Sequence, residues 1–366
     1  MFLTKSERAE KRKEIIRNFK SSENGLFHKG IFGLPFGTEE SELVIIPVPW
    51  DATTSYRAGT SAAPQTILEA SHQIDLYHPL YGDLWKEGIS IEPVNEDIIL
   101  QNNQLRTVTS NLLNELDQKP SSLVLIEKKE DYLYINSACE ALIPLLAAKS
   151  SMYLLQKKLV GFLGGDHSIS LGLIKALGDY YPDFTVLQID AHADLRKSYE
   201  GFDYSHASAM YNTMKIPAVK KIIQLGIRDY CAEEADLTAS EGNRIITYTW
   251  PELFKKLACG NNWKTIADEI ISHTGNNIYI SFDIDGMDPS LCPNTGTPVP
   301  GGFLFDQIQF LLYSISSAGK KVIGFDLCEV GYNNNTDWDA NVGMRVLYEL
   351  SCLTLATHFK QLTTDN

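Results

Sequence analysis

Aspartate and histidine residues alternate with small or apolar residues in two short stretches of this chain. LQIDAHADLR carries Asp190, His192 and Asp194, and SFDIDGMDP carries Asp283 and Asp285. Side chains two apart on an extended segment project to the same side, so each stretch presents one pair of metal-competent groups. The pairs are Asp190 with His192 and Asp283 with Asp285, and we expect them to face each other.

Two further apolar runs end in residues of the same kinds. GFLGGDHS contains Asp166 and His167, and GFDLCEVG contains Asp326 and Glu329. His167 and Asp194 would complete a shell of four carboxylates and two imidazoles. Carboxylates confined to one pocket raise one another's pKa values unless cations neutralise them, and two divalent ions supply four positive charges. This oxygen-rich set favours a pair of manganese or similar first-row ions over a single zinc ion.

The elements that must position these groups follow an α/β pattern. Short apolar runs alternate with longer helical patterns, which predicts a parallel sheet covered by helices in one domain. The carboxyl ends of parallel strands share one edge of the sheet, so we expect the four acidic segments to converge there. The predicted strands span residues 43–48, 159–163, 184–189, 221–225, 277–284 and 321–327, and the predicted helices include 138–148, 170–177, 263–272 and 305–317.

The first 40 residues read as an N-terminal extension to a catalytic domain of residues 41–366. Residues 5–19 predict an amphipathic helix, and the connector GLFHKGIFGLPFG follows it. We expect the extension to pack on the core or on a neighbouring subunit. Residues 85–130 are polar and weakly patterned, with QNNQ and QKPSS as turn signals.

Composition narrows the classes of partner and compartment. With 44% hydrophobic residues the chain can bury a substantial core. Its formal net charge of −14 argues against nucleic acid and anionic membranes as partners and favours a small cationic substrate. The six cysteines are scattered singly, as in a cytoplasmic protein with reduced thiols. The N-terminus lacks the apolar core of a signal peptide, and no apolar run approaches the roughly 20 residues that cross a bilayer.

Each motif also has a structural interpretation. His167, after two glycines and an aspartate, could be a buried turn histidine, and DIDGMDP could be a turn held by side-chain hydrogen bonds. The same stretch lacks the ligand spacing and terminal glutamate of a calcium-binding EF-hand. Unpaired acidic groups at the ends of apolar strands are costly to bury, so the set as a whole favours a metal site.

Three motifs resemble the ureohydrolase family, which contains arginase and agmatinase. They are GGDHS, DAHADLR and SFDIDGMDPSLCPNTGTPVPGG, in that order. The resemblance implies a three-layer α/β/α fold, a binuclear manganese centre, hydrolysis of a guanidino or amidino C–N bond, and homo-oligomers that are trimers or hexamers. It assigns one manganese ion to His167, Asp190, Asp194 and Asp283, and the other to Asp190, His192, Asp283 and Asp285.

Two further residues take roles from the same resemblance. His206, in YSHAS, corresponds to a proton-shuttling histidine, a role suited to an unperturbed pKa near 6.5. Glu329 corresponds to the carboxylate that binds the guanidinium group. Two divalent ions lower the pKa of a bound water and supply hydroxide near neutral pH. Glu329 would then orient the cationic substrate, and Asp194 would pass a proton to the departing amine.

The stretch LRKSYEGFDYSHAS is closer to agmatinase-like than to arginase-like sequences. We therefore expect agmatine as substrate, cleaved to putrescine and urea. Arginase, guanidinobutyrase, formimidoylglutamase and the nickel-dependent guanidine hydrolases are alternatives, and Ni²⁺ is an alternative metal. Tyr56 and Arg57 could line the entrance, or belong to a structural loop, and the asparagines of EVGYNNNTDWD could reshape the pocket mouth. Two different classes are a catalytically silent binding or regulatory paralogue, and a deacetylase of related fold with one zinc ion.

Overall fold

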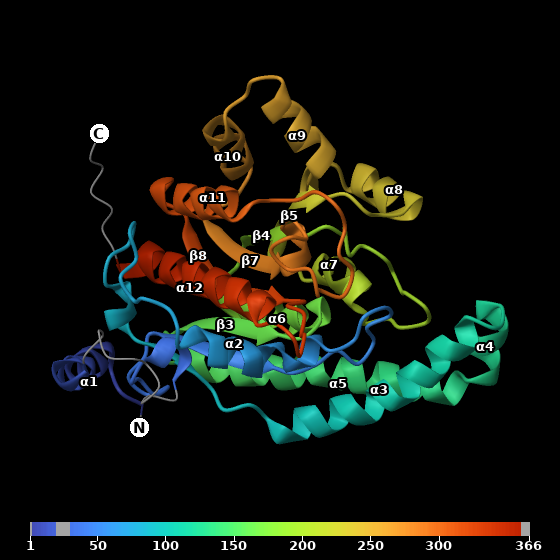
Figure 1. The fold of residues 1–366 in the computed structure, drawn as a ribbon, viewed down its shortest axis with the longest axis horizontal. Helices are drawn as coiled ribbons and strands as arrows, with labels where there is room; N and C mark the ends of the chain where they lie inside the picture. The colour runs from blue at the N-terminus through green and yellow to red at the C-terminus, as the bar shows by residue number, and fades with distance from the viewer. Residues whose placement is uncertain (1, 20–29, 360–366) are drawn as a thin grey trace.

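The computed structural model describes residues 2–19 and 30–359, which form a sheet between two helical layers (Figure 1). The sheet has eight strands in the order β2-β1-β3-β8-β7-β4-β5-β6, and every neighbouring pair is parallel. This confirms the predicted α/β class with a parallel central sheet. The strands are β1 (Leu43–Val48), β2 (Ile89–Ile91), β3 (Leu159–Gly164), β4 (Phe184–Ile189), β5 (Val219–Ile227), β6 (Ile245–Thr249), β7 (Asn277–Asp283) and β8 (Lys321–Cys328).

All six predicted strands are present, with ends that shift by a residue or two. Two strands were not predicted, β2 and β6, and they form the two edges of the sheet. β2 has only three residues, and β6 is partly exposed, so neither carries the long apolar run that marks a buried parallel strand.

Helices cover both faces of the sheet, as the three-layer prediction requires. Alternate strand residues enter different cores, for example Leu43 one and Val44 the other. Helices α2, α9, α10, α11 and α12 contribute to the first core, and α3, α5, α6 and α7 to the second. The helices are α1 (Lys5–Asn18), α2 (Ala63–Ser71), α3 (Glu96–Leu116), α4 (Ser121–Glu127), α5 (Lys129–Leu154), α6 (Ser170–Tyr180), α7 (Ala209–Thr213), α8 (Ala232–Glu241), α9 (Trp250–Ala258), α10 (Trp263–Ser272), α11 (Phe305–Ser317) and α12 (Trp338–Phe359).

The N-terminal helix packs on the core of its own chain. Thr4 caps α1, and the helix carries two buried arginines, Arg8 and Arg12. Both bind the buried carboxylate of Glu42, at 2.9 Å each, and Arg12 also binds Glu87 at 2.9 Å. A buried carboxylate needs such paired donors, so this cluster ties the extension to the residue that precedes β1. The first part of the predicted connector, residues 25–29, lies outside the described residues.

The region between residues 85 and 130 corrects one turn prediction. QNNQ, residues 101–104, lies inside α3, which buries Ile98, Asn102, Leu105, Thr109 and Leu112 at alternating spacings of four and three. Two polar residues on this stripe hid the helical period. QKPSS does separate two helices, because Pro120 is the N-cap of α4. Helices α3, α4 and α5 form an arm that extends to the right of Figure 1.

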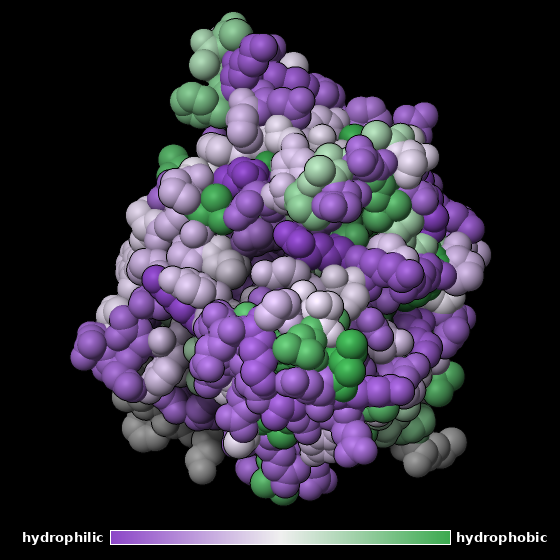
Figure 2. Space-filling model, turned by 90° about the vertical axis from the view of Figure 1, so that its right-hand side faces the viewer, coloured by the Kyte–Doolittle hydropathy of each residue, from purple (hydrophilic) through white to green (hydrophobic). Residues whose placement is uncertain are grey.

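The face at that side of the molecule is mostly hydrophilic, with apolar side chains in small separate groups (Figure 2). Among the residues that the structure describes, none of the helices combines the length and the apolar character that crossing a membrane requires.

Candidate metal centre

The acidic segments converge because four neighbouring strands carry them. β3, β8, β7 and β4 are adjacent in the sheet. His167 follows β3, Asp190 follows β4, Asp283 ends β7 and Glu329 follows β8. All four strands are parallel, so their carboxyl ends open on one edge of the sheet, as predicted.

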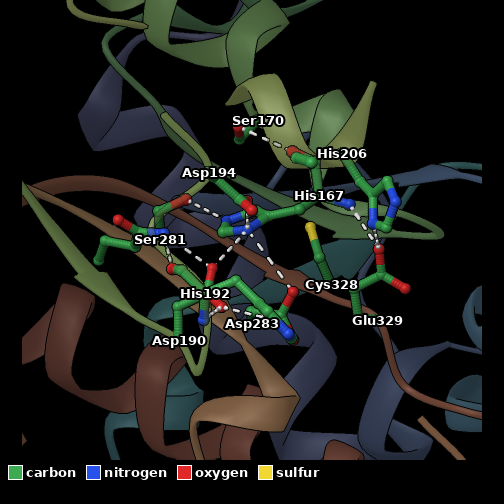
Figure 3. A network of polar contacts seen from close by, with 12 residues as sticks. His167, Ser170, Asp190, His192, Asp194, His206, Ser281, Asp283, Cys328 and Glu329 are labelled. Carbon is green, nitrogen blue, oxygen red and sulfur yellow. Dashed lines mark hydrogen bonds and ion pairs between the residues drawn. The ribbon is translucent and has the colours of Figure 1, made fainter. Parts of the chain in front are cut away.

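His167 lies at the centre of the first group of side chains (Figure 3). Its Nδ1 is 3.0 Å from Oδ2 of Asp190, 2.9 Å from Oδ2 of Asp194 and 3.6 Å from Oδ2 of Asp283. Nδ1 is buried and makes no hydrogen bond to any of these oxygens. On the other side of the ring, Nε2 lies 2.8 Å from Ser281 Oγ. An imidazole nitrogen that faces three carboxylates without a hydrogen bond is suited to a cation between them.

His192 lies at the centre of a second, adjoining group. Its Nδ1 is 3.0 Å from Oδ2 of Asp285 and 3.7 Å from Oδ1 of Asp190. Two sets of ligand atoms are close enough to hold an ion each, and Asp190 belongs to both. The sets are His167, Asp190 and Asp283, and Asp190, His192 and Asp285. The structure therefore brings all six predicted ligands together, with Asp194 beside His167.

The local geometry differs from the extended pairs that the spacing suggested. β4 ends before Asp190 and β7 ends at Asp283, so the alternating residues lie in turns. The backbone N–H of His192 donates to Asp190 at 2.7 Å, and that of Asp285 donates to Asp283 at 2.9 Å. A Cβ on Gly286 would lie 2.6 Å from the backbone nitrogen of Asp190, so only glycine lets the two turns approach this closely.

The carboxylates of this site perturb one another strongly. Burial, and then Asp285 and Asp190, raise the pKa of Asp283 well above its usual range. Burial and the neighbouring Asp190 raise the pKa of Asp194 to about 7. Burial alone would lower the pKa of His192, but Asp285 and Asp190 raise it to about 12. Without added cations, protons must neutralise the negative charge of the carboxylates. This donor set therefore fits divalent ions, which would take the place of those protons.

His206 and Glu329 form a separate pair beside the acidic groups (Figure 3). His206 Nδ1 is 3.5 Å from Oε1 of Glu329, which also accepts a hydrogen bond from the backbone N–H of His167 at 3.1 Å. Oε2 of Glu329 is buried without a partner. Burial alone would lower the pKa of His206, but the Glu329 carboxylate raises it to about 9. The expectation of an unperturbed histidine was wrong, because the carboxylate that faces it lies far away in the sequence.

A cleft of about 400 Å³ opens over these groups. Its wall includes His192, Asp194, Asp283 and His206, whereas His167, Asp190, Asp285 and Glu329 lie behind the wall. Tyr56 and Arg57 line it, which favours the entrance over the structural-loop interpretation of this stretch. Sequence reasoning missed other residues of the wall, although two of them lie in the LRKSYEGFDYSHAS stretch that follows the DAHAD motif. These are Arg196, Tyr199, Asp229, Glu234 and Thr297.

The asparagine-rich loop lies elsewhere. Asn333, Asn334 and Asn335 line a different cavity of about 500 Å³, together with Thr66 and Gln73. The expectation that this loop reshapes the pocket mouth was therefore wrong. Its link to the site is indirect, because Asn333 binds Asn294, and the next residue along, Thr295, donates a hydrogen bond to the carbonyl of Glu329 at 2.7 Å.

Comparison with known proteins identifies the family. The model of the arginase family matches residues 41–352. The chain belongs to the arginase family. This confirms the predicted ureohydrolase resemblance and the prediction that the chain is a hydrolase.

Relatives within the arginase family match most of the chain. The N(1)-aminopropylagmatine ureohydrolase of Synechocystis sp. is 30% identical over 294 residues, which cover 80% of this chain and 82% of that protein. The agmatinase of Halalkalibacterium halodurans is 29% identical over 296 residues, which cover 80% of this chain and 84% of that protein. The solved agmatine ureohydrolase of Thermoplasma volcanium aligns with a TM-score of 0.68 at 23% identity, covering 96% of this chain and 100% of that one. The solved structure supports the fold.

Proposed function

We propose that this arginase-family hydrolase cleaves agmatine to putrescine and urea at a pair of Mn²⁺ ions. The carrying observation is the largely buried set of four aspartates and two histidines, three of which line one cleft together with His206, and which adjoins Glu329. The names of the relatives favour agmatine or an aminopropyl derivative of it over arginine. We also propose that the protein is cytoplasmic and that it assembles as a trimer or hexamer.

The donor set fits two ions of the manganese type. Carboxylate oxygens outnumber imidazoles, and no cysteine belongs to either group of ligand atoms among the described residues. Such a mixed oxygen and nitrogen set suits Mn²⁺, whereas structural zinc sites commonly use thiolates. His167, Asp190, Asp194 and Asp283 would hold one ion, and Asp190, His192, Asp283 and Asp285 the other. Two divalent ions held there would supply hydroxide from bound water near neutral pH.

Glu329 would bind the guanidinium group. Its free Oε2 is buried, and a buried carboxylate forms strong, charge-assisted hydrogen bonds with a guanidinium. In this structure His206 occupies the position opposite Glu329. The imidazole would therefore yield to the substrate, which would take over the pairing with the carboxylate.

Asp194 and His206 would handle protons. Both line the cleft, so both can reach the leaving nitrogen or solvent. Burial and the charge of Asp190 raise the pKa of Asp194 to about 7. Asp194 would pass a proton to the departing amine. His206, next to Ser55 at the cleft wall, would return protons from solvent.

The test is a substrate screen with Mn²⁺ and Ni²⁺ in parallel. Agmatine, N(1)-aminopropylagmatine, arginine, guanidinobutyrate, guanidine and formimidoylglutamate are each assayed for urea or formamide and for the released amine or ammonia. We expect agmatine with Mn²⁺ to give the highest kcat/KM. A metal-loaded protein that is inactive on every compound would favour a silent binding paralogue, and one zinc ion per chain would favour a deacetylase. Light scattering measures the assembly.

A further inference from the structure

Arg228 occupies a position behind the candidate metal centre that no motif pointed to. It directly follows β5, and its guanidinium donates hydrogen bonds to backbone carbonyl oxygens of three separate segments. In the described part of the chain it forms no ion pair. The acceptors are Gly226 at 3.0 Å, Asp285 at 2.7 Å, Gly286 at 3.4 Å, Met287 at 3.1 Å and Val299 at 3.0 Å from an Nη and 3.3 Å from Nε.

The surrounding backbone leaves room for this group only because of a glycine. Gly302 has a φ of +106°, and a Cβ there would lie 2.8 Å from an Nη of Arg228 and 2.6 Å from the carbonyl oxygen of Met287. Its neighbour Phe303 donates to the carbonyl of Gly286 at 3.1 Å. The PVPGG segment thus encloses the guanidinium against the turn that carries Asp285.

That turn holds one half of the candidate metal centre. The carboxylate of Asp285 accepts a hydrogen bond from Ala191 N at 2.9 Å and lies 3.0 Å from His192 Nδ1. Its backbone oxygen is the acceptor closest to Arg228. Val299, another acceptor, belongs to the cleft wall together with Thr297, whose hydroxyl is 3.4 Å from Asp285.

We propose that Arg228 is a positioning residue that fixes the 284–287 turn, so that Asp285 and His192 can hold the second of the two ions. The inference rests on the proposed function, because it assumes the ion pair. Arginine suits this role, since its planar fork offers five N–H donors in fixed directions, whereas lysine offers three on a flexible stem. His167 lies on the β3 side of the site, away from this turn, so its ion should depend less on Arg228 than the other ion does.

The test compares Mn²⁺ binding by wild type, Arg228→Met, Arg228→Lys and a matched control, Arg345→Met. Arg345 is exposed on α12, and its side chain donates hydrogen bonds to Asn341 and Met344. Binding is titrated against a fluorescent chelator, and electron paramagnetic resonance distinguishes a coupled Mn²⁺ pair from a single ion. We expect Arg228→Met to weaken the binding of one ion by about 10- to 100-fold, as loss of a ligand-supporting contact does, and to weaken the binding of the other ion much less, because the two ions share Asp190 and Asp283. The Mn²⁺ affinity of Arg228→Lys should lie between those of wild type and Arg228→Met, and the affinity of Arg345→Met should match that of wild type.

The outcomes separate this inference from the proposed function. A wild-type protein that binds no ions contradicts both. Two ions of unchanged affinity in Arg228→Met, with the coupled signal intact, overturn the role of Arg228 alone. Equal weakening of both ions also overturns it, because a general loss of structure would do that. If Arg228→Met does not fold, Arg228→Lys and a crystal structure of the Mn²⁺-loaded wild type provide the test. A crystal structure in which the Arg228 guanidinium no longer contacts the Asp285 carbonyl would contradict the proposal.

Discussion

Replacing Glu329 by glutamine tests how the substrate is bound. Glutamine keeps the shape of the side chain, and its carbonyl oxygen can still accept the hydrogen bond from His167 N, so we expect the fold and the metal sites to persist. The substitution removes the negative charge that would face a guanidinium in a site where the carboxylate is only 3% exposed. Leaving a buried cation without its partner costs about 3–5 kcal/mol. At about 1.4 kcal/mol per factor of ten, kcat/KM should fall by about 10²- to 10⁴-fold.

The assay is steady-state urea release from agmatine, with the metal content of each protein measured on the same sample. Glu92→Gln is the matched control, because Glu92 is also a poorly exposed carboxylate, paired with Lys149 at 3.0 Å, but does not line the cleft. A second readout is the titration of His206 in the metal-free protein. Since Glu329 contributes most to raising the pKa of His206 to about 9, the pKa of His206 should be lower in the variant. A variant with two ions and wild-type kcat/KM would refute the assignment of Glu329 to the guanidinium.

Three further outcomes are expected. Asp190→Asn or Asp283→Asn should abolish urea release and weaken Mn²⁺ binding while circular dichroism stays native; wild-type turnover would remove the residue from the ligand set. Chelation should abolish activity, and at 1,000 times Kd Mn²⁺ should add about 4 kcal/mol to the free energy of unfolding; an unchanged melting temperature would argue against binding to the folded state. Burial alone would raise the pKa of Glu42, but Arg8 and Arg12 hold it below the usual 4.5. Its stabilising effect is therefore present above pH 4.5 and lost as the pH falls through the folded-state pKa, so Glu42→Gln should lose about 3–5 kcal/mol at pH 7 and flatten this acid dependence in denaturant titrations.

The convergence of the acidic segments was predictable because it requires only that the strands be parallel, so that their carboxyl ends share one edge of the sheet. The reason for the spacing was not, since Asp190 and Asp283 begin turns in which each carboxylate accepts the N–H two residues on. A strand end and a turn of this kind place alternate residues equally well, and the letters alone do not distinguish them.

Contacts that depend on tertiary structure could not be predicted from the sequence. The partners of Arg228 are backbone carbonyls, which every residue possesses, so no side-chain pattern signals them. The asparagine loop follows Glu329 directly, yet its chain turns away to a different cavity. Burial of Asn102 in α3 was hidden for a similar reason, because its partner Asp51 lies on a distant segment.

The candidate metal ligands lie at the ends of three parallel strands, β3, β4 and β7, and this placement imposes an order on maturation. These residues come from distant parts of the chain, so the proposed ion at His167 would have its full set of donors only after the pairing of β3, β8, β7 and β4, and the other ion only after the pairing of β7 and β4. If the proposed ions bind, they would therefore be loaded after these strands have paired. Because affinity alone ranks copper, nickel and zinc ahead of manganese, any ion bound in purified protein would reflect the metals available to the folded chain. The metals in the growth medium and the lysis buffer should therefore be controlled in every measurement of metal content and activity.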